Sequence, residues 1–121
     1  MTTLVDTSLL VRPTGTTGIT DELRMSIISV GELELGVLDA RTPQEREGRM
    51  ARLTELLNLI PVLGVDAAVA LAYAGLRSVS GRRPTNDLWI AATALAHNLT
   101  LATGDERQAK LAGVHARYHP A

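Results

Sequence analysis

Acidic side chains stand at the borders of the apolar segments in this sequence. Asp6 and Asp105 each follow a short apolar run that we expect to be a strand, whereas Glu32 and Asp87 stand at the start of expected helices. An Asp in such a position is often only a helix cap, because its oxygens accept hydrogen bonds from free backbone N–H groups. Taken alone, each acid fits either a cap or part of a functional site.

Carboxylates gathered in one place would favour a bound metal ion. Two of them about 4 Å apart repel by about 4 kcal/mol at an effective dielectric constant of about 20, so a cluster persists only with protons or cations. Oxygen ligands without Cys or His favour Mg²⁺ or Mn²⁺, which are held by one or two carboxylates, by water and by substrate phosphates. The chemistry would be hydrolysis or transfer at phosphorus.

Short apolar runs separated by loop residues predict strands that alternate with helices. The expected strands are Thr3–Val5, Met25–Ser29, Ile60–Val65, Leu99–Thr103 and Val114–Tyr118. The expected helices are Thr7–Val11, one turn at Asp21–Arg24, Glu32–Ala40, Pro43–Leu59, a segment from Asp66 to Gly81, Leu88–His97 and Asp105–Leu111. This alternation predicts crossovers onto a parallel sheet with helices on both faces.

Two of the helix predictions rest on particular residues. TPQE at Thr42–Glu45 has the form of a capping box with proline in the first helical position, and Leu53, Leu56 and Ile60 then follow on one face. ELELGVLDA permits a strand or a helix by its alternation of Glu and Leu. We expect a helix, because a strand already precedes it.

The expected topology brings the acids together. In a parallel sheet the carboxyl ends of the strands and the amino ends of the helices lie at the same edge, where open α/β sheets bind ligands. Asp6, Glu32, Asp87 and Asp105 are therefore expected on one rim. Residues two apart on a helix point in different directions, so only Glu32 or Glu34 can face this rim, and its place in the pattern favours Glu32.

Composition limits the classes of protein that fit. The chain of 121 residues has no Cys, three His and a net charge of −1, and aromatic residues make up 2% of it. Disulfides and thiolate metal sites are excluded, and binding of nucleic acid through a uniformly basic surface is not expected. No apolar stretch reaches the roughly 20 residues of a membrane span, so we expect one soluble, cytoplasmic domain over residues 1–121.

Four segments, taken in order, resemble one family. LVDTSLL, SVGELELGV, NDLWIAATALAHNLTLAT and TGD are similar to the PIN domain and, within it, to the bacterial VapC toxins, which are metal-dependent ribonucleases. The resemblance covers nearly the whole chain, and residues 86–105 carry its most specific part. It implies a three-layer α/β fold in which helices flank a parallel five-stranded sheet.

The same resemblance implies roles for particular residues. Asp6, Glu32, Asp87 and Asp105 match the family's acidic quartet, and Asp6, Asp87 and Asp105 would be ligands of Mg²⁺ or Mn²⁺. Thr103 matches a small hydroxyl residue that accompanies the last acid, and it is a candidate for contact with the substrate. The implied partners are an RNA substrate, a small cognate antitoxin and a second copy in a homodimer. The segment between Asp6 and Glu32 is shorter than in many relatives, which leaves the contacts built there open.

Two arginines beside the most specific motif have two readings. Arg82 and Arg83, in GRRPT, could hold substrate phosphates near Asp87, or they could simply keep a connector solvated. The sequence does not decide between these readings.

We therefore predict a Mg²⁺- or Mn²⁺-dependent endoribonuclease toxin that hydrolyses RNA phosphodiester bonds and is inhibited by a cognate antitoxin. The alternative from another class is a catalytically silent module of the same fold that binds RNA or regulates. A metal-dependent phosphatase or DNA nuclease is a further alternative, because the acids define metal and phosphate but not the sugar.

Overall fold

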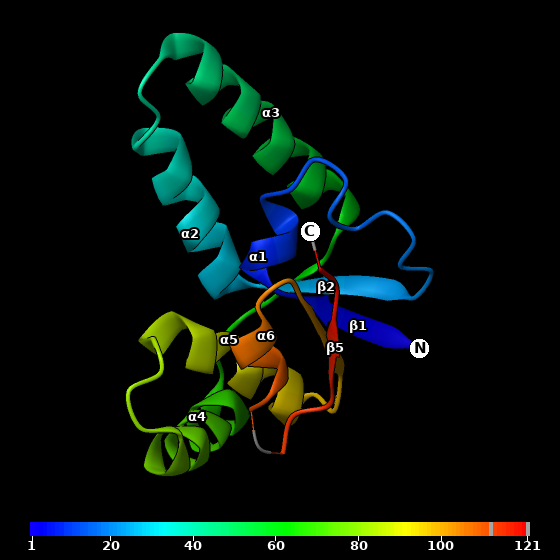
Figure 1. The fold of residues 1–121 in the computed structure, drawn as a ribbon, viewed down its shortest axis with the longest axis vertical. Coiled ribbons are helices and arrows are strands. Elements are labelled where there is room, and N and C mark those ends of the chain that lie inside the picture. The colour runs from blue at the N-terminus through cyan, green and yellow to red at the C-terminus, as the bar shows by residue number, and fades with distance from the viewer. Residues whose placement is uncertain (112, 121) are drawn as a thin grey trace.

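The computed structural model describes residues 1–111 and 113–120, whose strands form one parallel sheet (Figure 1). The strands are β1 (Thr2–Val5), β2 (Glu22–Ser26), β3 (Val62–Leu63), β4 (Thr100–Thr103) and β5 (Ala116–Tyr118), in the spatial order β3-β2-β1-β4-β5. The helices are α1 (Thr7–Leu10), α2 (Ile27–Leu38), α3 (Pro43–Leu59), α4 (Ala67–Ser80), α5 (Thr85–Ala96) and α6 (Glu106–Ala109). The predicted class, a parallel five-stranded sheet flanked by helices, is confirmed.

The central strand, β1, lies between β2 and β4. Leu4 is paired with Arg24 on one side and with Leu101 on the other, and both pairings are parallel. The chain runs outward from β1 through β2 to β3, and it then returns to place β4 on the other side of β1. Open α/β sheets bind ligands at such a switch point, beyond the carboxyl ends of the strands. The acids that follow β1 and β4 are therefore neighbours at the switch point.

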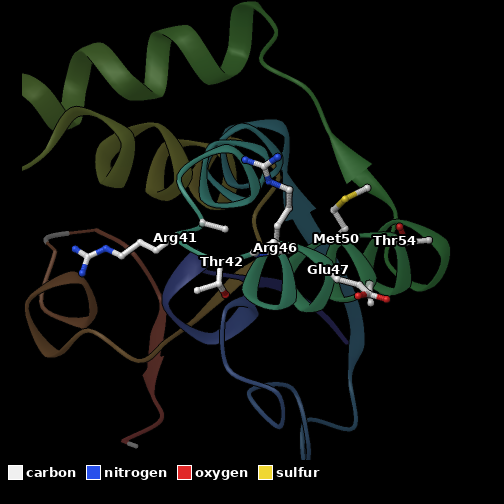
Figure 2. A pocket seen from close by; sticks show the side chains of 9 residues that line it. Arg41, Thr42, Arg46, Glu47, Met50 and Thr54 are labelled. Carbon is white, nitrogen blue, oxygen red and sulfur yellow. The ribbon is translucent and has the colours of Figure 1, made fainter.

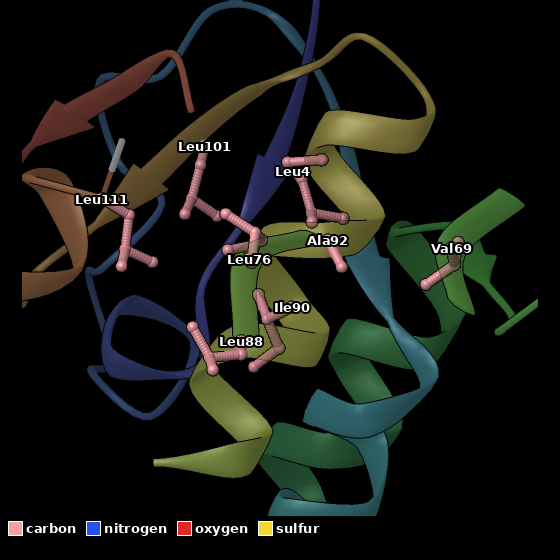
Figure 3. Packing of buried hydrophobic residues seen from close by; sticks show 10 residues of the cluster. Leu4, Val69, Leu76, Leu88, Ile90, Ala92, Leu101 and Leu111 are labelled. Carbon is pink, nitrogen blue, oxygen red and sulfur yellow. The ribbon is translucent and has the colours of Figure 1, made fainter. Parts of the chain in front are cut away.

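The two central strands contribute to separate hydrophobic cores on the two faces of the sheet. Leu4 and Leu101 belong to a cluster with side chains of α4 and α5, which Figure 3 shows. Val5 and Ala102 belong to a second cluster with side chains of α1 and α3. Since successive side chains of a strand point to opposite faces, this division shows that helices cover both faces.

The helices form two groups. Figure 1 shows α2 and α3 as a hairpin that extends from the sheet, and α4 packed against α5 at the opposite end. Between α4 and α5 the rings of Tyr73 and Trp89 are stacked, with centroids 3.8 Å apart. Trp89 is therefore used in packing. No helix within residues 1–111 and 113–120 combines the length and apolar character needed to cross a bilayer.

Two predicted elements between β1 and α3 are wrong. The strand predicted at Met25–Ser29 ends at Ser26, because the Ser26 hydroxyl accepts a hydrogen bond from the Ile28 N–H at 3.0 Å and starts α2 there. The turn predicted at Asp21–Arg24 is not helical, because residues 22–24 belong to β2, which pairs with β1. At Ser26 the cap outweighs the strand preference of the following β-branched residues. At residues 22–24 the pairing with β1 outweighs the local preference for a helix.

Other boundaries differ less from the prediction. The helix Pro43–Leu59 is confirmed, and the Thr42 hydroxyl accepts from the Glu45 N–H at 3.0 Å, as its capping pattern indicates. The predicted strand Ile60–Val65 is shorter, since only Val62–Leu63 pair with β2. The Ala-rich helix begins earlier than predicted, at Thr85, which places Asp87 within its first turn.

We predict opposite effects of alanine at two glycines. A Cβ on Gly15 would overlap the Leu9 carbonyl oxygen, so Gly15→Ala should lower the free energy of unfolding by about 1–3 kcal/mol. A Cβ on Gly75, within α4, would meet nothing within 4 Å, so Gly75→Ala should raise that free energy by roughly 0.5–1 kcal/mol. Urea denaturation measures both. A Gly15→Ala variant as stable as wild type would contradict the close approach of this loop to α1.

Candidate functional site

The Asp6 carboxylate, at the end of β1, is held by two hydroxyl groups. Asp6 is 4% exposed, and its Oδ2 accepts hydrogen bonds from Ser8 Oγ and Thr103 Oγ1, each at 2.7 Å. Asp6 also occupies the cap position of α1, but its side chain makes no capping hydrogen bond. The cap reading therefore does not hold for Asp6, and its functional role stays a prediction.

Thr103 connects β1 to the loop that follows β4. Its buried hydroxyl donates to Asp6 and accepts from the Asp105 N–H at 3.0 Å. Beside it, Ser8 Oγ accepts from the Gly104 N–H at 2.8 Å. These bonds fix the loop of Asp105 relative to Asp6. Thr103 thus positions both acids from within the protein, while its predicted contact with substrate stays a prediction.

Asp105 caps α6. Its Oδ1 accepts a hydrogen bond from the Arg107 N–H at 2.9 Å, so the cap reading holds for this oxygen. The residue is only partly buried, and a carboxylate has a second oxygen. The capping hydrogen bond therefore orients the Asp105 carboxylate and leaves its second oxygen able to accept a hydrogen bond or to bind a cation.

Glu32 lies in the second turn of α2 rather than at the helix start as predicted, because α2 already begins at Ile27. Its Oε1 accepts from Thr7 Oγ1 at 2.7 Å, and Thr7 Oγ1 is also 2.8 Å from Ser29 Oγ. Glu34 is exposed. Of the two glutamates it is therefore Glu32 that faces the start of α1, directly after Asp6.

Asp87 lies beside Arg83 in the first turn of α5. Arg83 Nη2 is 3.2 Å from Asp87 Oδ2, and the two side chains are 15% and 26% exposed. The same nitrogen donates to Gln108 Oε1 at 2.9 Å, and Gln108 Nε2 donates to the main-chain oxygen of Asp87 at 2.7 Å. Arg83 thus has partners within the protein, whereas Arg82 is exposed. A phosphate contact of either arginine stays a prediction.

The other three acids act on Asp87 electrostatically. Burial raises the pKa of Asp87 above its ordinary value, and the charges of Asp6, Asp105 and Glu32 raise it further, while Arg83 lowers it. Charge repulsion weakens with distance, so these effects indicate that the four acids share one region. A cation in this region would relieve the repulsion.

The oxygen donors suit a hard cation that keeps part of its water. Within residues 1–111 and 113–120, no three Asp, Glu, His or Cys side chains are grouped closely enough to hold one ion. Mg²⁺ does not require three protein ligands, because it usually keeps several waters and takes one or two carboxylates. Asp6 and Asp87 fit such a site by their chemistry, since Asp6 is the acid whose charge raises the pKa of Asp87 most.

Two hollows lie along α3, and one of them reaches an acid of the quartet. A groove of about 810 Å³ between α2 and α3 is lined by Glu32 and Gly36 on one side and by Gly48 on the other. The second hollow, of about 540 Å³, lies at the corner between α2 and α3, around Arg46 and Met50 (Figure 2). None of the four acids lines this second hollow.

Sequence reasoning missed two residues that contact the site. Gln108 is almost fully buried beside Asp87. The Arg12 guanidinium lies against Gly104, and its Nη1 donates to the His119 main-chain oxygen at 3.1 Å. Neither residue belongs to a motif or to a periodic pattern, so only the folded arrangement identifies them.

Comparison with known proteins points to one family. The model of the PIN domain matches residues 3–114. Ribonuclease VapC4 of Mycobacterium tuberculosis is 39% identical over 97 residues, which are 77% of this chain and 74% of that protein. Ribonuclease VapC5 of the same organism is 38% identical over 99 residues, which are 78% of this chain and 73% of that protein.

Solved structures share the fold over nearly the whole chain. One is the crystal structure of a member of the VapBC family of toxin-antitoxin systems, VapBC-5 from Mycobacterium tuberculosis. It has a TM-score of 0.83 and 33% identity, and the match covers 99% of this chain and 98% of that chain. The crystal structure of FitAcB from Neisseria gonorrhoeae has a TM-score of 0.81 and 29% identity, with 98% and 97% covered.

We predict that Asp87→Asn stabilises the metal-free protein at neutral pH. Because folding raises the pKa of Asp87, the folded state binds this proton more tightly than the unfolded state does. The carboxyl group thus favours folding below its ordinary pKa, and this contribution is lost as the pH rises through the raised pKa. Asn cannot lose a proton, so the variant should melt above wild type at about pH 7 and close to it at about pH 3.

Melting in the presence of EDTA at the two pH values measures this difference. Glu34→Gln is the matched control, because Glu34 is exposed and should show little effect at either pH. If Asp87→Asn melts above wild type by the same amount at both pH values, its stabilisation does not come from removal of the Asp87 charge.

Proposed function

The chain belongs to the PIN-domain family, in its VapC group, and on this premise we propose that it is a toxin that hydrolyses RNA phosphodiester bonds with Mg²⁺ or Mn²⁺. The observation that carries the proposal is the arrangement of the acids: Thr103 bonds to Asp6 and to the Asp105 N–H, and Glu32 faces the start of the helix after Asp6. Burial raises the pKa of Asp87, and the charges of Asp6, Asp105 and Glu32 raise it further in spite of Arg83. A fold gains no stability from such repulsion, and perturbed acids of this kind are typical of functional sites.

In this proposal Asp6 and Asp87 hold the ion directly, and Asp105, the third predicted ligand, would bind it through one of the water molecules that Mg²⁺ keeps. When bound, Mg²⁺ or Mn²⁺ would lower the pKa of a water molecule and neutralise charge that develops on the phosphate. The hydroxyls beside Asp6 hold that carboxylate in one orientation, since both donate to the same oxygen. Glu32, which Thr7 holds through Oε1, would orient the attacking water or accept its proton.

RNA would approach over the connector between α4 and α5. Arg77 holds this connector, because its Nη1 donates to the Arg83 main-chain oxygen at 3.1 Å and its Nη2 donates to Thr85 Oγ1 at 3.2 Å. Arg82 is exposed on the connector that is fixed in this way. A phosphate of the substrate is the partner that we propose for it, since contacts of Arg with phosphate position nucleic acid.

We further propose a homodimer in the cytoplasm. Leu71 and Val79, both on α4, are 77% and 72% exposed, and a second copy could cover them. The absence of Cys fits a reducing compartment. Light scattering that gives a monomer at micromolar concentration would contradict the dimer.

The central test is cleavage of a mixed RNA pool by the purified protein. We expect cleavage with Mg²⁺ or Mn²⁺ and none with EDTA. Asp6→Asn and Asp87→Asn should each reduce the rate by more than the roughly 10–100-fold that partners outside the ligand shell usually cost. Glu32→Gln should reduce it far more than Glu34→Gln, because only Glu32 faces the site.

The controls separate this proposal from its rivals. Cleavage of DNA in place of RNA, or release of phosphate alone, would assign the site to another reaction. RNA binding without cleavage under every metal condition would favour a silent module. Full activity of either Asn variant would remove that residue from the site.

We also propose that a small protein inhibits the site by lying in the groove between α2 and α3. The groove reaches Glu32, and Gly36 and Gly48 in its walls allow another backbone to approach closely. Outside the quartet, Lys and Arg outnumber the remaining acids, so negative charge is concentrated at the rim. An Arg of the partner would suit the acids in place of a metal ion, because its guanidinium pairs with carboxylates through two hydrogen bonds.

Co-expression with the product of the adjacent reading frame tests this inhibition. The complex should not cleave RNA, and it should bind Mn²⁺ more weakly than the free chain, by roughly the 5–150-fold usual for coupled ligands. Gly48→Arg is the matched variant, because it fills the groove from the wall formed by α3, which carries none of the four acids, and should prevent complex formation while leaving cleavage unchanged. A complex that binds Mn²⁺ as tightly as the free chain and cuts RNA would contradict the mechanism.

A further inference from the structure

Gln108 is buried between α6 and the start of α5, where it contacts two residues of the site. It is 1% exposed. Its Nε2 donates to the Asp87 main-chain oxygen at 2.7 Å, and its Oε1 accepts from Arg83 Nη2 at 2.9 Å. Arg83 Nη2 also donates to Asp87 Oδ2 at 3.2 Å. These contacts form a closed ring that holds Asp87 by both its main chain and its carboxylate.

The two partners of Gln108 determine which way its amide points. A main-chain oxygen only accepts hydrogen bonds, and a guanidinium only donates them. A flipped amide would place acceptor against acceptor at Asp87 and donor against donor at Arg83. The ring therefore requires a side chain that carries a donor and an acceptor together at this length.

Gln108 also connects two elements that carry acids of the quartet. It lies on α6, which Asp105 caps, and it bonds to α5, which carries Asp87. Its hydrogen bonds therefore set the position of Asp87 relative to the loop of Asp105. On the other side of that loop Thr103 makes the corresponding connection to Asp6.

The ring has a cost for folding. The Arg83 side chain is 15% exposed, and within the described part of the chain its Nε is buried without a hydrogen-bond partner. A buried donor without a partner destabilises a fold, and apolar side chains of similar volume would avoid this cost. Stability of the fold is therefore a poor explanation for a buried Arg and Gln at this place.

We propose that Gln108 is a positioning residue that, through Arg83 and the Asp87 main chain, holds the Asp87 carboxylate in the orientation needed for metal binding and RNA cleavage. The cleavage part of this inference rests on the proposed function, whereas the metal-binding part can be measured without cleavage. Gln108 is buried behind Asp87, so its loss changes turnover and metal affinity rather than the binding of RNA.

Two substitutions test the role of Gln108. Gln108→Met keeps the volume of the side chain and removes both hydrogen bonds. We expect kcat per folded molecule to fall roughly 10–100-fold with little change in KM, and the Kd for Mn²⁺ to rise by a similar factor in titration calorimetry. Gln108→Glu keeps the shape of the side chain but places an acceptor against the Asp87 main-chain oxygen. Its kcat and its affinity for Mn²⁺ should therefore fall at least as far as those of Gln108→Met.

Thr93→Val is the control for loss of a buried hydrogen bond elsewhere in α5. The Thr93 hydroxyl donates to the Trp89 main-chain oxygen at 2.9 Å within the helix. This variant should melt at a lower temperature without a change in kcat or in the affinity for Mn²⁺.

The outcomes distinguish the positioning role from the proposed function. If the loss of activity in Gln108→Met matches its unfolded fraction and its Kd for Mn²⁺ is that of wild type, the positioning role is overturned. If wild type binds Mn²⁺ but cleaves no RNA, the ribonuclease proposal fails. Weaker Mn²⁺ binding by folded Gln108→Met would support the positioning role even in that case.

Discussion

The hydrogen bond from the Thr103 hydroxyl to the Asp6 carboxylate is the contact on which the rest of the site depends. It joins the ends of β1 and β4, the two strands at the switch point of the sheet. A carboxylate that is 4% exposed requires such donors, and a hydrogen bond to a charged group contributes about 1.5–3 kcal/mol to stability. The same hydroxyl accepts from the Asp105 N–H, so one side chain fixes the distance between the first acid and the loop of the last.

The negative charge of each of the four acids is stabilised by a different partner, and this explains how the fold tolerates them in one region. Asp6 accepts from hydroxyls, Asp87 is paired with Arg83, and Asp105 accepts from the amino end of α6. Glu32 accepts from Thr7, on the helix that follows Asp6. The compensation is incomplete at Asp87, whose pKa is raised in spite of Arg83. Burial is the largest cause of this shift and the charges of the other acids add to it, so a cation beside Asp87 would stabilise its charged form.

The alternation of apolar runs was sufficient to predict a parallel sheet between helices. The geometry of such sheets also predicts the edge at which Asp6 and Asp105 follow their strands. The sequence also predicted the helix Pro43–Leu59 correctly, because the cap that starts it is formed by neighbouring residues, Thr42 and Glu45. It failed at Met25–Ser29, where β-branched residues continue into a helix that Ser26 starts, and at β2, whose pairing with β1 is long-range. The role of Gln108 could not be predicted from the sequence either, because its partners lie 21 and 25 positions away and share no sequence pattern with it.

The position of β4 in the sheet also determines when the site can form during synthesis. Asp6 leaves the ribosome before its partner Thr103, which follows 97 positions later. β4 must then insert beside β1 in the centre of the sheet, and β5 must close the edge. Chains emerge at about 5–20 residues per second, and domains fold as units once they are complete. A nascent chain that has not yet extended past Thr103 therefore carries only unassembled parts of the site.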